Sequence, residues 1–362
     1  MEQVTIQKDG KRKVVNGRIE VEAKDGGLLL LGQDGKLWAL QPGDIAKRKS
    51  NDLEFAPLSV DEQSKALMAE LPDGFAIHKT AHYLICYNTS KAYAQWCGSL
   101  YERLHRGFYN YWRKRGMELH DPDTMLVAVV FDSESSYAEY GRDELGDAAK
   151  SIVGYYSLQS NRIATYDLTG HGDVRAANGR RPGTSAVIND ILSQPSAAPT
   201  VATTIHEATH QLAYNSGLQT RYADNPLWLS EGLAIYFETP DLGSKRGWRG
   251  IGAVNSVRLN QFRQDLANGN RQPLLELLTN DKLLRSSDTA LGGYAQSWGL
   301  CYYLAKRHPK QLAKYLAELS EKPPLGKDTA EEKLKLFQEH FGTDLDKFER
   351  RFVSYLANLK SR

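Results

Sequence analysis

Two histidines four residues apart are the clearest chemical signature of the chain. His206 and His210 enclose Glu207 in the sequence His206-Glu207-Ala208-Thr209-His210. On a helix, residues four apart lie on one face, so a single divalent metal ion can contact both imidazoles. Glu207 lies beside them and can take a proton from a water molecule that the metal activates.

A glutamate further along the chain completes a ligand set. Glu231 follows His210 with 20 residues between them. Two histidines and one glutamate leave a fourth position for water, as in catalytic zinc sites, whereas structural sites close all four positions, usually with cysteine. We therefore expect His206, His210 and Glu231 to form a catalytic metal centre. The alternative is a surface helix whose two histidines bind nothing.

Both ligand-bearing segments have helical patterns. Glycine at position 217 is a plausible C-cap of the first helix, Asn225 is the expected N-cap of the second, and Pro226 suits its first helical position. In the second helix, Glu231 and Glu238 share a face with Leu227 and Ala234. The first helix is indicated by an apolar stripe of Val201, Ile205, Ala208 and Leu212.

The two segments together resemble the gluzincin metallopeptidases. The resemblance is carried by residues 205–212 (IHEATHQL) and 226–238 (PLWLSEGLAIYFE). The chain is most similar to the peptidase-MA-like domains of uncharacterised bacterial proteins, and more distantly to the aminopeptidase N family, in which a W-L-x-E-G-x-A-x-Y motif supplies the glutamate ligand. The resemblance implies Zn²⁺ bound by His206, His210 and Glu231, with Glu207 as general base. It is specific over residues 200–240, looser from about 75 to 310, and does not cover the N-terminal segment.

Two further residues are candidates for the same centre. Tyr294 lies 63 residues after Glu231, and its segment resembles the part of aminopeptidase N in which a tyrosine donates a hydrogen bond to the oxyanion. A phenol is a suitable donor beside a metal; the alternative is a packing role, as for most of the 19 tyrosines. Glu238 is a candidate to hold a ligand histidine in its metal-binding tautomer, with an ordinary surface carboxylate as the alternative.

A strand before the first ligand helix is a candidate for binding substrate. Residues 154–156 and 161–166 predict a hairpin-like pair. In gluzincins the strand preceding the HExxH helix edges the cleft, so the resemblance implies that Asn161, Ile163 and Thr165 contact an extended substrate by β-augmentation; an ordinary edge strand is the alternative. The following residues 167–200 predict a long loop, as a lid or a disordered segment. His171 in this loop is expected to be solvated, and the alternative is that it approaches the metal.

The whole chain predicts an α+β fold. Residues 1–50 predict a small SH3-like β-barrel, which either binds a partner or docks on the catalytic domain. A helical connector at 51–74 precedes a zincin-like half at 75–240, with a mixed sheet and the HExxH helix, and a mostly helical half at 241–362 completes the cleft. Turns in the barrel are expected at Asp9-Gly10, Asn16-Gly17, Asp25-Gly26 and Asp34-Gly35.

Composition narrows the class of protein. Of the 362 residues, 41% are hydrophobic and 25% are charged, which is typical of a soluble globular protein. The net charge of +2 argues against a nucleic-acid or anionic-membrane partner. No apolar run is long enough for a membrane span, and residues 1–5 do not resemble a signal peptide, although export with a signal peptide outside this chain stays an alternative. The three cysteines could form at most one disulfide, and buried free thiols are expected instead.

These observations predict a zinc-dependent metallopeptidase that hydrolyses a peptide or protein. The G-x-M-E-N motif with which aminopeptidase N holds a free amine does not precede the HExxH segment, so we expect an endopeptidase. Cobalt or manganese could replace zinc at such a site. Two alternatives are a non-catalytic, metal-containing envelope or binding protein, and a metallohydrolase of a non-peptide amide or epoxide.

Overall fold

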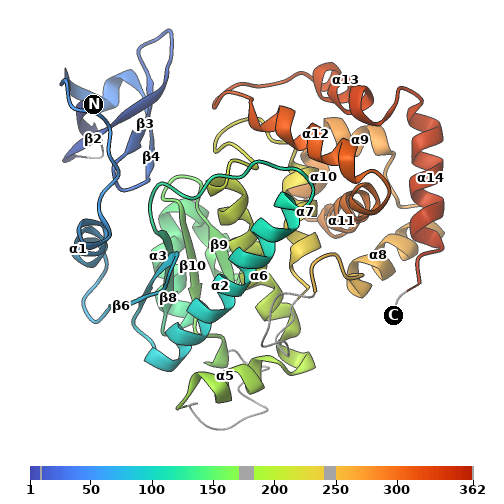
Figure 1. Cartoon of the computed structure of the whole chain (residues 1–362), viewed down its shortest axis with the longest axis horizontal. Coiled ribbons are helices and arrows are strands. Elements are labelled where there is room, and N and C mark those ends of the chain that lie inside the picture. Colours follow the sequence, from blue (N-terminus) through green and yellow to red (C-terminus); the bar gives the residue numbers. More distant parts are fainter. Residues whose placement is uncertain (9, 171–182, 240–249, 361–362) are drawn as a thin grey trace. The chain divides into compact units, whose positions relative to one another are not determined.

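The computed structural model describes residues 1–8, 10–170, 183–239 and 250–360 (Figure 1). Its contacts divide the chain into two compact units. Unit 1 consists of Met1–Glu102 and Asp121–Ala197, and unit 2 of Arg103–His120 and Ala198–Arg362. The fold is α+β, because unit 1 holds every described strand and unit 2 is helical. No helix in the described part of the chain is long and apolar enough to cross a membrane.

Unit 1 begins with a five-stranded antiparallel sheet in the order β4-β3-β2-β1-β5. Its core consists of Val4, Ile6, Val15, Leu28, Leu30 and Leu40. The described strands do not form the closed barrel that the sequence predicts, because β4 and β5 do not pair with each other. The strands are β1 (Glu2–Lys8), β2 (Lys11–Glu22), β3 (Leu28–Gly32), β4 (Leu37–Leu40) and β5 (Ile45–Ser50), with a 3-10 turn at Pro42–Asp44 before β5.

One predicted turn in this sheet is wrong. Asn16-Gly17 lies inside the twelve-residue strand β2, where Asn16 pairs with Gln3 and Gly17 with Glu2. A Cβ at position 17 would lie 2.4 Å from the carbonyl oxygen of Leu31 on the neighbouring strand. Glycine is therefore required here for close backbone approach and not for a turn.

A mixed sheet follows in unit 1, in the order β6-β7-β8-β10-β9. Strands β7, β8 and β10 are parallel, and β6 and β9 pair antiparallel at the two edges. Every residue of β8 is buried, as its continuous apolar sequence predicts, and α3 packs against β8 and β10. The strands are β6 (Ala76–Lys79), β7 (Tyr83–Tyr87), β8 (Leu126–Phe131), β9 (Gly154–Tyr156) and β10 (Arg162–Tyr166); the helices are α1 (Val60–Glu70), α3 (Glu134–Leu145) and α5 (Ser185–Leu192).

A partly buried ion-pair network joins the first sheet to the second within unit 1. Glu70 of α1 accepts from Lys36 Nζ at 2.6 Å and from both terminal nitrogens of Arg162 on β10 at 3.0 Å. Lys36 and Arg162 are 7% and 5% exposed, so the carboxylate of Glu70 neutralises two cations that are removed from water. The first sheet is therefore tied to the second by charged contacts, while docking and partner binding both stay predictions for the N-terminal segment.

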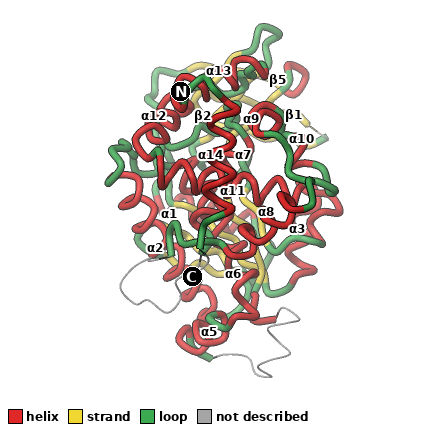
Figure 2. Tube along the Cα trace, turned by 90° about the vertical axis from the view of Figure 1, so that its right-hand side faces the viewer, coloured by secondary structure: helices red, strands yellow, loops and turns green. Residues whose placement is uncertain are grey.

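Unit 2 is built around helix α11 (Ala290–Arg307), which contacts α7, α8, α10, α12 and α14 (Figures 1 and 2). Helix α2 (Lys91–Arg113) runs across the boundary between the units, and its last part belongs to unit 2. The other helices are α6 (Ala198–Asn215), α7 (Leu227–Phe237), α8 (Ser256–Ala267), α9 (Leu274–Thr279), α10 (Lys282–Arg285), α12 (Pro309–Ser320), α13 (Ala330–Phe341) and α14 (Leu345–Ala357). Short 3-10 turns at Gly146–Lys150, Leu168–Gly170 and Pro195–Ala197 complete the elements of unit 1.

The C-terminal half is mostly helical in its described part, as predicted. The expected loop at 167–200 contains helix α5 in its described part, so it is not wholly irregular. Residues 171–182, including His171, lie outside the described residues. Cys86, Cys97 and Cys301 are buried free thiols, as predicted.

Candidate metal centre

Helix α6 presents two imidazoles on one face. The apolar stripe at its back, represented by Ile205 and Ala208, is fully buried and fixes which side of the helix faces outward. His206 and His210 are four residues apart and so lie one helical turn from each other, with ring centroids separated by 4.8 Å. Their Nε2 atoms lie 3.1 Å from each other. The helix ends before Gly217, whose positive φ of 79° agrees with the predicted C-cap.

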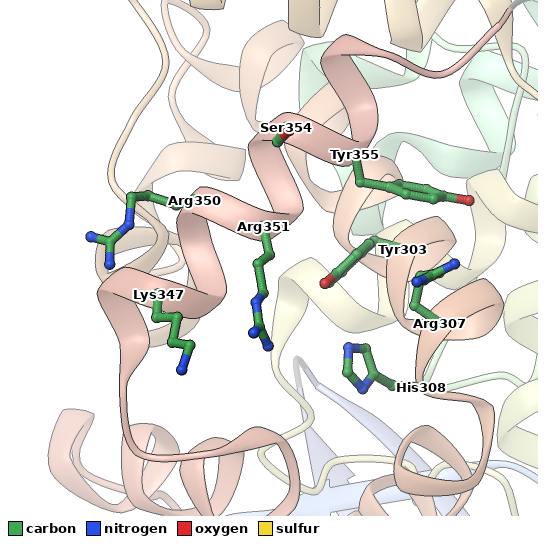
Figure 3. A pocket seen from close by; sticks show the side chains of 8 residues that line it. All are labelled: Tyr303, Arg307, His308, Lys347, Arg350, Arg351, Ser354 and Tyr355. Atoms are coloured by element: carbon green, nitrogen blue, oxygen red, sulfur yellow. The ribbon is translucent and has the colours of Figure 1, made fainter.

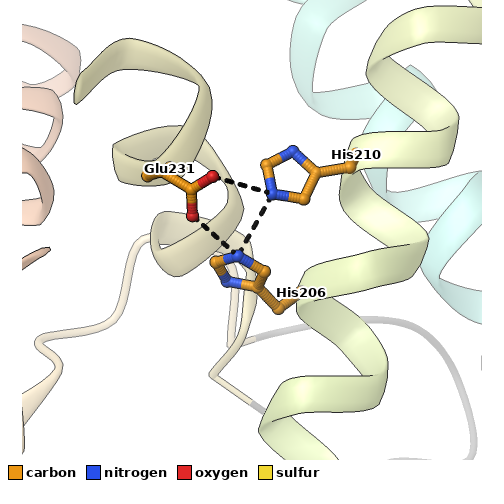
Figure 4. Close-up of side chains that lie close together, drawn as sticks. All are labelled: His206, His210 and Glu231. Carbon is orange, nitrogen blue, oxygen red and sulfur yellow. Dashed lines mark hydrogen bonds and ion pairs between the residues drawn. The ribbon is translucent and has the colours of Figure 1, made fainter. Parts of the chain in front are cut away.

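Helix α7 brings the carboxylate to this pair (Figure 4). Glu231 Oε2 lies 3.1 Å from His206 Nε2, and Glu231 Oε1 lies 3.6 Å from His210 Nε2. The three side chains are only 12–15% exposed. All residues of α7 except Leu227 and Glu231 are buried, so Glu231 is a polar side chain on an otherwise packed helix.

The start of α7 differs by one residue from the prediction. Pro226 is the N-cap, not the first helical residue, and Asn225 precedes it. The Asn225 side chain donates instead to the carbonyls of Thr220 and Ala223, which orders the segment leading into the helix. The residue before Glu231 is fixed as well, because Ser230 accepts a buried hydrogen bond of 2.7 Å from Gln219.

The geometry of the three ligand atoms fits a bound metal ion. All lie within 4.8 Å of one another, and the three closest approaches are 3.1, 3.1 and 3.6 Å. Tetrahedral ligands about 2.0–2.1 Å from zinc are separated by about 3.3 Å, which is close to these values. A carboxylate and two unprotonated imidazole nitrogens facing one another would repel, so this arrangement favours a cation among them.

The pKa shifts of Glu231 and His206 also favour a positive charge beside the carboxylate. Burial alone would raise the pKa of Glu231, but His210 and His206 outweigh it and hold this pKa well below its usual value. Burial alone would lower the pKa of His206, but its contacts with Glu231 and Glu238 outweigh burial and raise this pKa well above its usual value. The site therefore favours an ionised carboxylate and a positive charge next to it.

Glu238 contacts the other nitrogen of the His206 ring. Its Oε2 lies 3.2 Å from His206 Nδ1, while its Oε1 accepts from Asn255 Nδ2 at 2.9 Å. A carboxylate at Nδ1 favours the tautomer that carries the proton there and leaves Nε2 unprotonated toward Glu231 and His210. Asn255 is the N-cap of α8 and also accepts from the backbone of Arg258. Asn255 is not among the residues predicted from the sequence, although an Asn-Ser pair before a helical pattern is a recognisable capping signal.

Tyr294 lies in the electrostatic range of the same carboxylates. Burial, and then the charges of Glu231 and Glu207, raise the pKa of Tyr294 to about 12, so its phenol stays protonated and able to donate. Arg258 lies over the ring, with its guanidinium carbon 5.6 Å from the centroid. The structure thus brings Tyr294, in the first part of helix α11, together with Glu207 and the three ligand candidates in one region of unit 2.

Close packing fixes α7 against α11. A Cβ at Gly232 would lie 2.5 Å from both Cys301 Sγ and the carbonyl oxygen of Ser297. Only a glycine allows the two helices to approach this closely. The helix that carries Glu231 therefore has a fixed position relative to the helix that carries Tyr294.

The predicted substrate strand is not an edge. Strand β10 pairs with β8 on one side and with β9 on the other, so the three residues of β9 occupy the edge. Asn161 precedes β10 with a φ of 60°, and Asn161, Ile163 and Thr165 are 7%, 0% and 1% exposed. The edge-strand prediction is therefore wrong, and burial gives no support to contacts of these side chains with a substrate.

Residues 200–326 match the model of a protein family described as "Protein of unknown function (DUF1570)". The match includes His206, His210, Glu231, Glu238 and Tyr294. No curated protein matches the chain. The family description assigns no activity, so a function can be inferred only from the residues of the site.

Proposed function

We propose that the chain is a zinc-dependent peptide hydrolase of the gluzincin type, with a zincin-like catalytic unit. The observation that carries the proposal is the convergence of His206, His210 and Glu231 from two packed helices, with Glu207 retained between the histidines. A zinc ion held by these residues would supply Lewis-acid activation of a carbonyl and of a water molecule. A structural zinc site has no need of a general base, so the presence of Glu207 favours catalysis over a purely structural metal.

Each remaining residue has a role in this proposal. Glu207 takes a proton from the attacking water and delivers it to the leaving amine. Tyr294 donates a hydrogen bond to the oxygen that gains negative charge as the carbonyl is attacked. Glu238, held by Asn255, orients the imidazole of His206. The absence of a G-x-M-E-N motif from the sequence favours endopeptidase over aminopeptidase action.

The test is to measure metal content and cleavage of a quenched-peptide library for the parent protein, Glu207→Gln and Glu276→Gln. Glu276 is an exposed glutamate of α9 and serves as the matched control. We expect about one zinc per chain in all three proteins, because one His, His, Glu site holds one ion. The parent and the control should cleave, and Glu207→Gln should not.

Three outcomes contradict the proposal. Zinc binding by the parent without cleavage of any peptide would leave a metal-binding protein or a hydrolase of a non-peptide amide. No zinc binding by the parent would remove the metal centre itself. Equal cleavage by the parent and Glu207→Gln would show that another group is the general base.

A further inference from the structure

A second group of functional side chains in unit 2 lies outside the metal centre (Figure 3). The end of α11, the residue that follows it and one face of α14 line a pocket of about 690 Å³. This volume is in the range of small-molecule sites. The lining residues are Tyr303, Arg307, His308, Lys347, Arg350, Arg351, Ser354 and Tyr355.

The α14 residues of the pocket are spaced at helical intervals. Lys347, Arg351 and Tyr355 follow one another at four-residue steps and so lie on one face of the helix. The adjacent buried face of α14 holds the end of α11 in place, because the Tyr303 ring packs 5.6 Å from Phe348 and 5.2 Å from Tyr355. Arg351 extends toward Tyr303 and His308, whereas Arg350 extends away toward the outer rim (Figure 3).

The pocket carries an excess of positive charge. Its lining includes three arginines and one lysine and no acidic side chain. Within the described ranges, no ion pair is formed by Arg307, Lys347, Arg350 or Arg351. The glutamate of α14, Glu349, is instead bound by Arg271 at 2.6 Å.

Two of these cations stand at positions unfavourable for a helix, although the N-cap Asp344 and Asp346 in the first turn stabilise the same end of α14. Lys347 is the third residue of α14, where the helix dipole disfavours a cation. Arg351 follows it at the i+4 position, where like charges destabilise a helix. The imidazole of His308 lies beside the same cations. Burial, and then the charges of Arg307 and Arg351, lower the pKa of His308. Four cations with no acidic side chain among the lining residues favour an anionic ligand.

We propose that this pocket binds a small molecule carrying two or more phosphate groups. The guanidinium forks of Arg307 and Arg351 match phosphate oxygens in a bidentate geometry, and Lys347 adds a point charge. Ser354 offers a hydroxyl donor, and the exposed cations leave the pocket accessible to a soluble ligand. The site lies at the end of α11 away from Tyr294 and does not depend on the peptidase proposal.

The test uses inorganic pyrophosphate as the probe, in calorimetric titrations at about 0.15 M salt, where weak surface attraction is largely screened. The proteins are the parent, Arg307→Gln/Arg351→Gln, and the control Lys310→Gln/Lys314→Gln. Lys310 and Lys314 are exposed cations at i and i+4 on α12 and do not line the pocket. We expect saturable one-to-one binding by the parent and the control, and a Kd at least about 100-fold weaker for the arginine variant.

Two further measurements test the location of the ligand and its chemistry. The metal-centre variant His210→Ala should bind pyrophosphate as the parent does, so loss of binding in it would place the ligand at the metal centre and overturn the proposal. Citrate, a carboxylate anion of comparable charge, should bind more weakly than pyrophosphate; equal binding would overturn the assignment to phosphate.

Loss of binding in the lysine control, or no saturable binding by the parent, would show general charge attraction only. If the arginine double variant does not fold, the single variant Lys347→Gln replaces it. Removing one exposed cation from the first turn of α14 should not destabilise the helix. A Kd for Lys347→Gln equal to that of the parent would contradict the proposal.

Discussion

Replacing Glu238 by glutamine should weaken metal binding through the tautomer of His206. In the parent, Glu238 Oε1 accepts from Asn255 at 2.9 Å, and Oε2 lies 3.2 Å from His206 Nδ1. In Glu238→Gln the amide oxygen would face Asn255, so the NH₂ group would face His206 Nδ1. A donor at this position forces the imidazole proton onto Nε2 and removes the lone pair that a metal needs.

The size of the effect follows from the burial of the pair. His206 and Glu238 are only 14% and 12% exposed, so loss of the acceptor costs free energy that water cannot fully restore. Loss of a carboxylate that orients a ligand histidine lowers metal affinity by about 10–100-fold, or about 1.4–2.7 kcal/mol. Zinc affinity is measured by competition with a chelating dye, with the exposed Glu276→Gln as the control.

A second substitution should reverse the loss. In Glu238→Gln/Asn255→Asp, one aspartate oxygen keeps the N-cap bond from Arg258, and the other can accept from the glutamine NH₂ group. The glutamine oxygen then faces His206 Nδ1, and the metal-binding tautomer is restored. A Glu238→Gln affinity within about twofold of the parent would refute this reasoning, as would a double variant no better than the single one.

Three further outcomes are expected. Tyr294→Phe should lower kcat by about 10²–10³-fold, with KM little changed, in steady-state peptide cleavage; a change in KM alone would show that Tyr294 only binds substrate. Gly232→Ala should destabilise unit 2 by about 1–3 kcal/mol in chemical denaturation, because its methyl group overlaps α11; unchanged stability would contradict the close packing. Burial would raise the pKa of Glu70, but Arg162 and Lys36 outweigh it and lower this pKa to about 2 from 4.5. A depressed folded-state pKa means that the stabilisation is present above pH 4.5 and is lost as pH falls toward 2. Because Glu70 is 43% exposed, we expect a stabilisation of only about 1–2 kcal/mol, measured as the difference between the acid denaturation curves of the parent and of Glu70→Gln. Coincident curves would contradict this prediction.

The metal-ligand candidates could be predicted from the sequence because their arrangement is local. The step from His206 to His210 is one helical turn, and the apolar stripe of α6 sets which side faces outward. The position of Glu231 depended on the surrounding motif, since a glutamate on a helix is common. The structure brings these residues together, whereas their roles in binding and catalysis stay predictions.

The features that the sequence did not predict depend on long-range packing. The Asn16-Gly17 sequence is typical of a turn, but it forms a strand because β2 pairs with both β1 and β3. The predicted pairing of residues 154–156 with 161–166 is confirmed, because β9 pairs antiparallel with β10. The wrong part is the sheet edge, which β9 occupies and which the prediction assigned to β10. Asn255 could be recognised as a cap, but its contact with Glu238 depends on how the chain returns to α7.

The three buried thiols make the opening of each unit separately measurable. Cys86 and Cys97 belong to unit 1 and Cys301 to unit 2. Burial raises the pKa of all three, that of Cys86 to about 12, and only the thiolate reacts quickly with alkylating reagents. Each cysteine therefore reacts only slowly with the reagent until its surroundings open. Time-resolved alkylation read by mass spectrometry would give one opening rate for each unit of the native chain, without any introduced label.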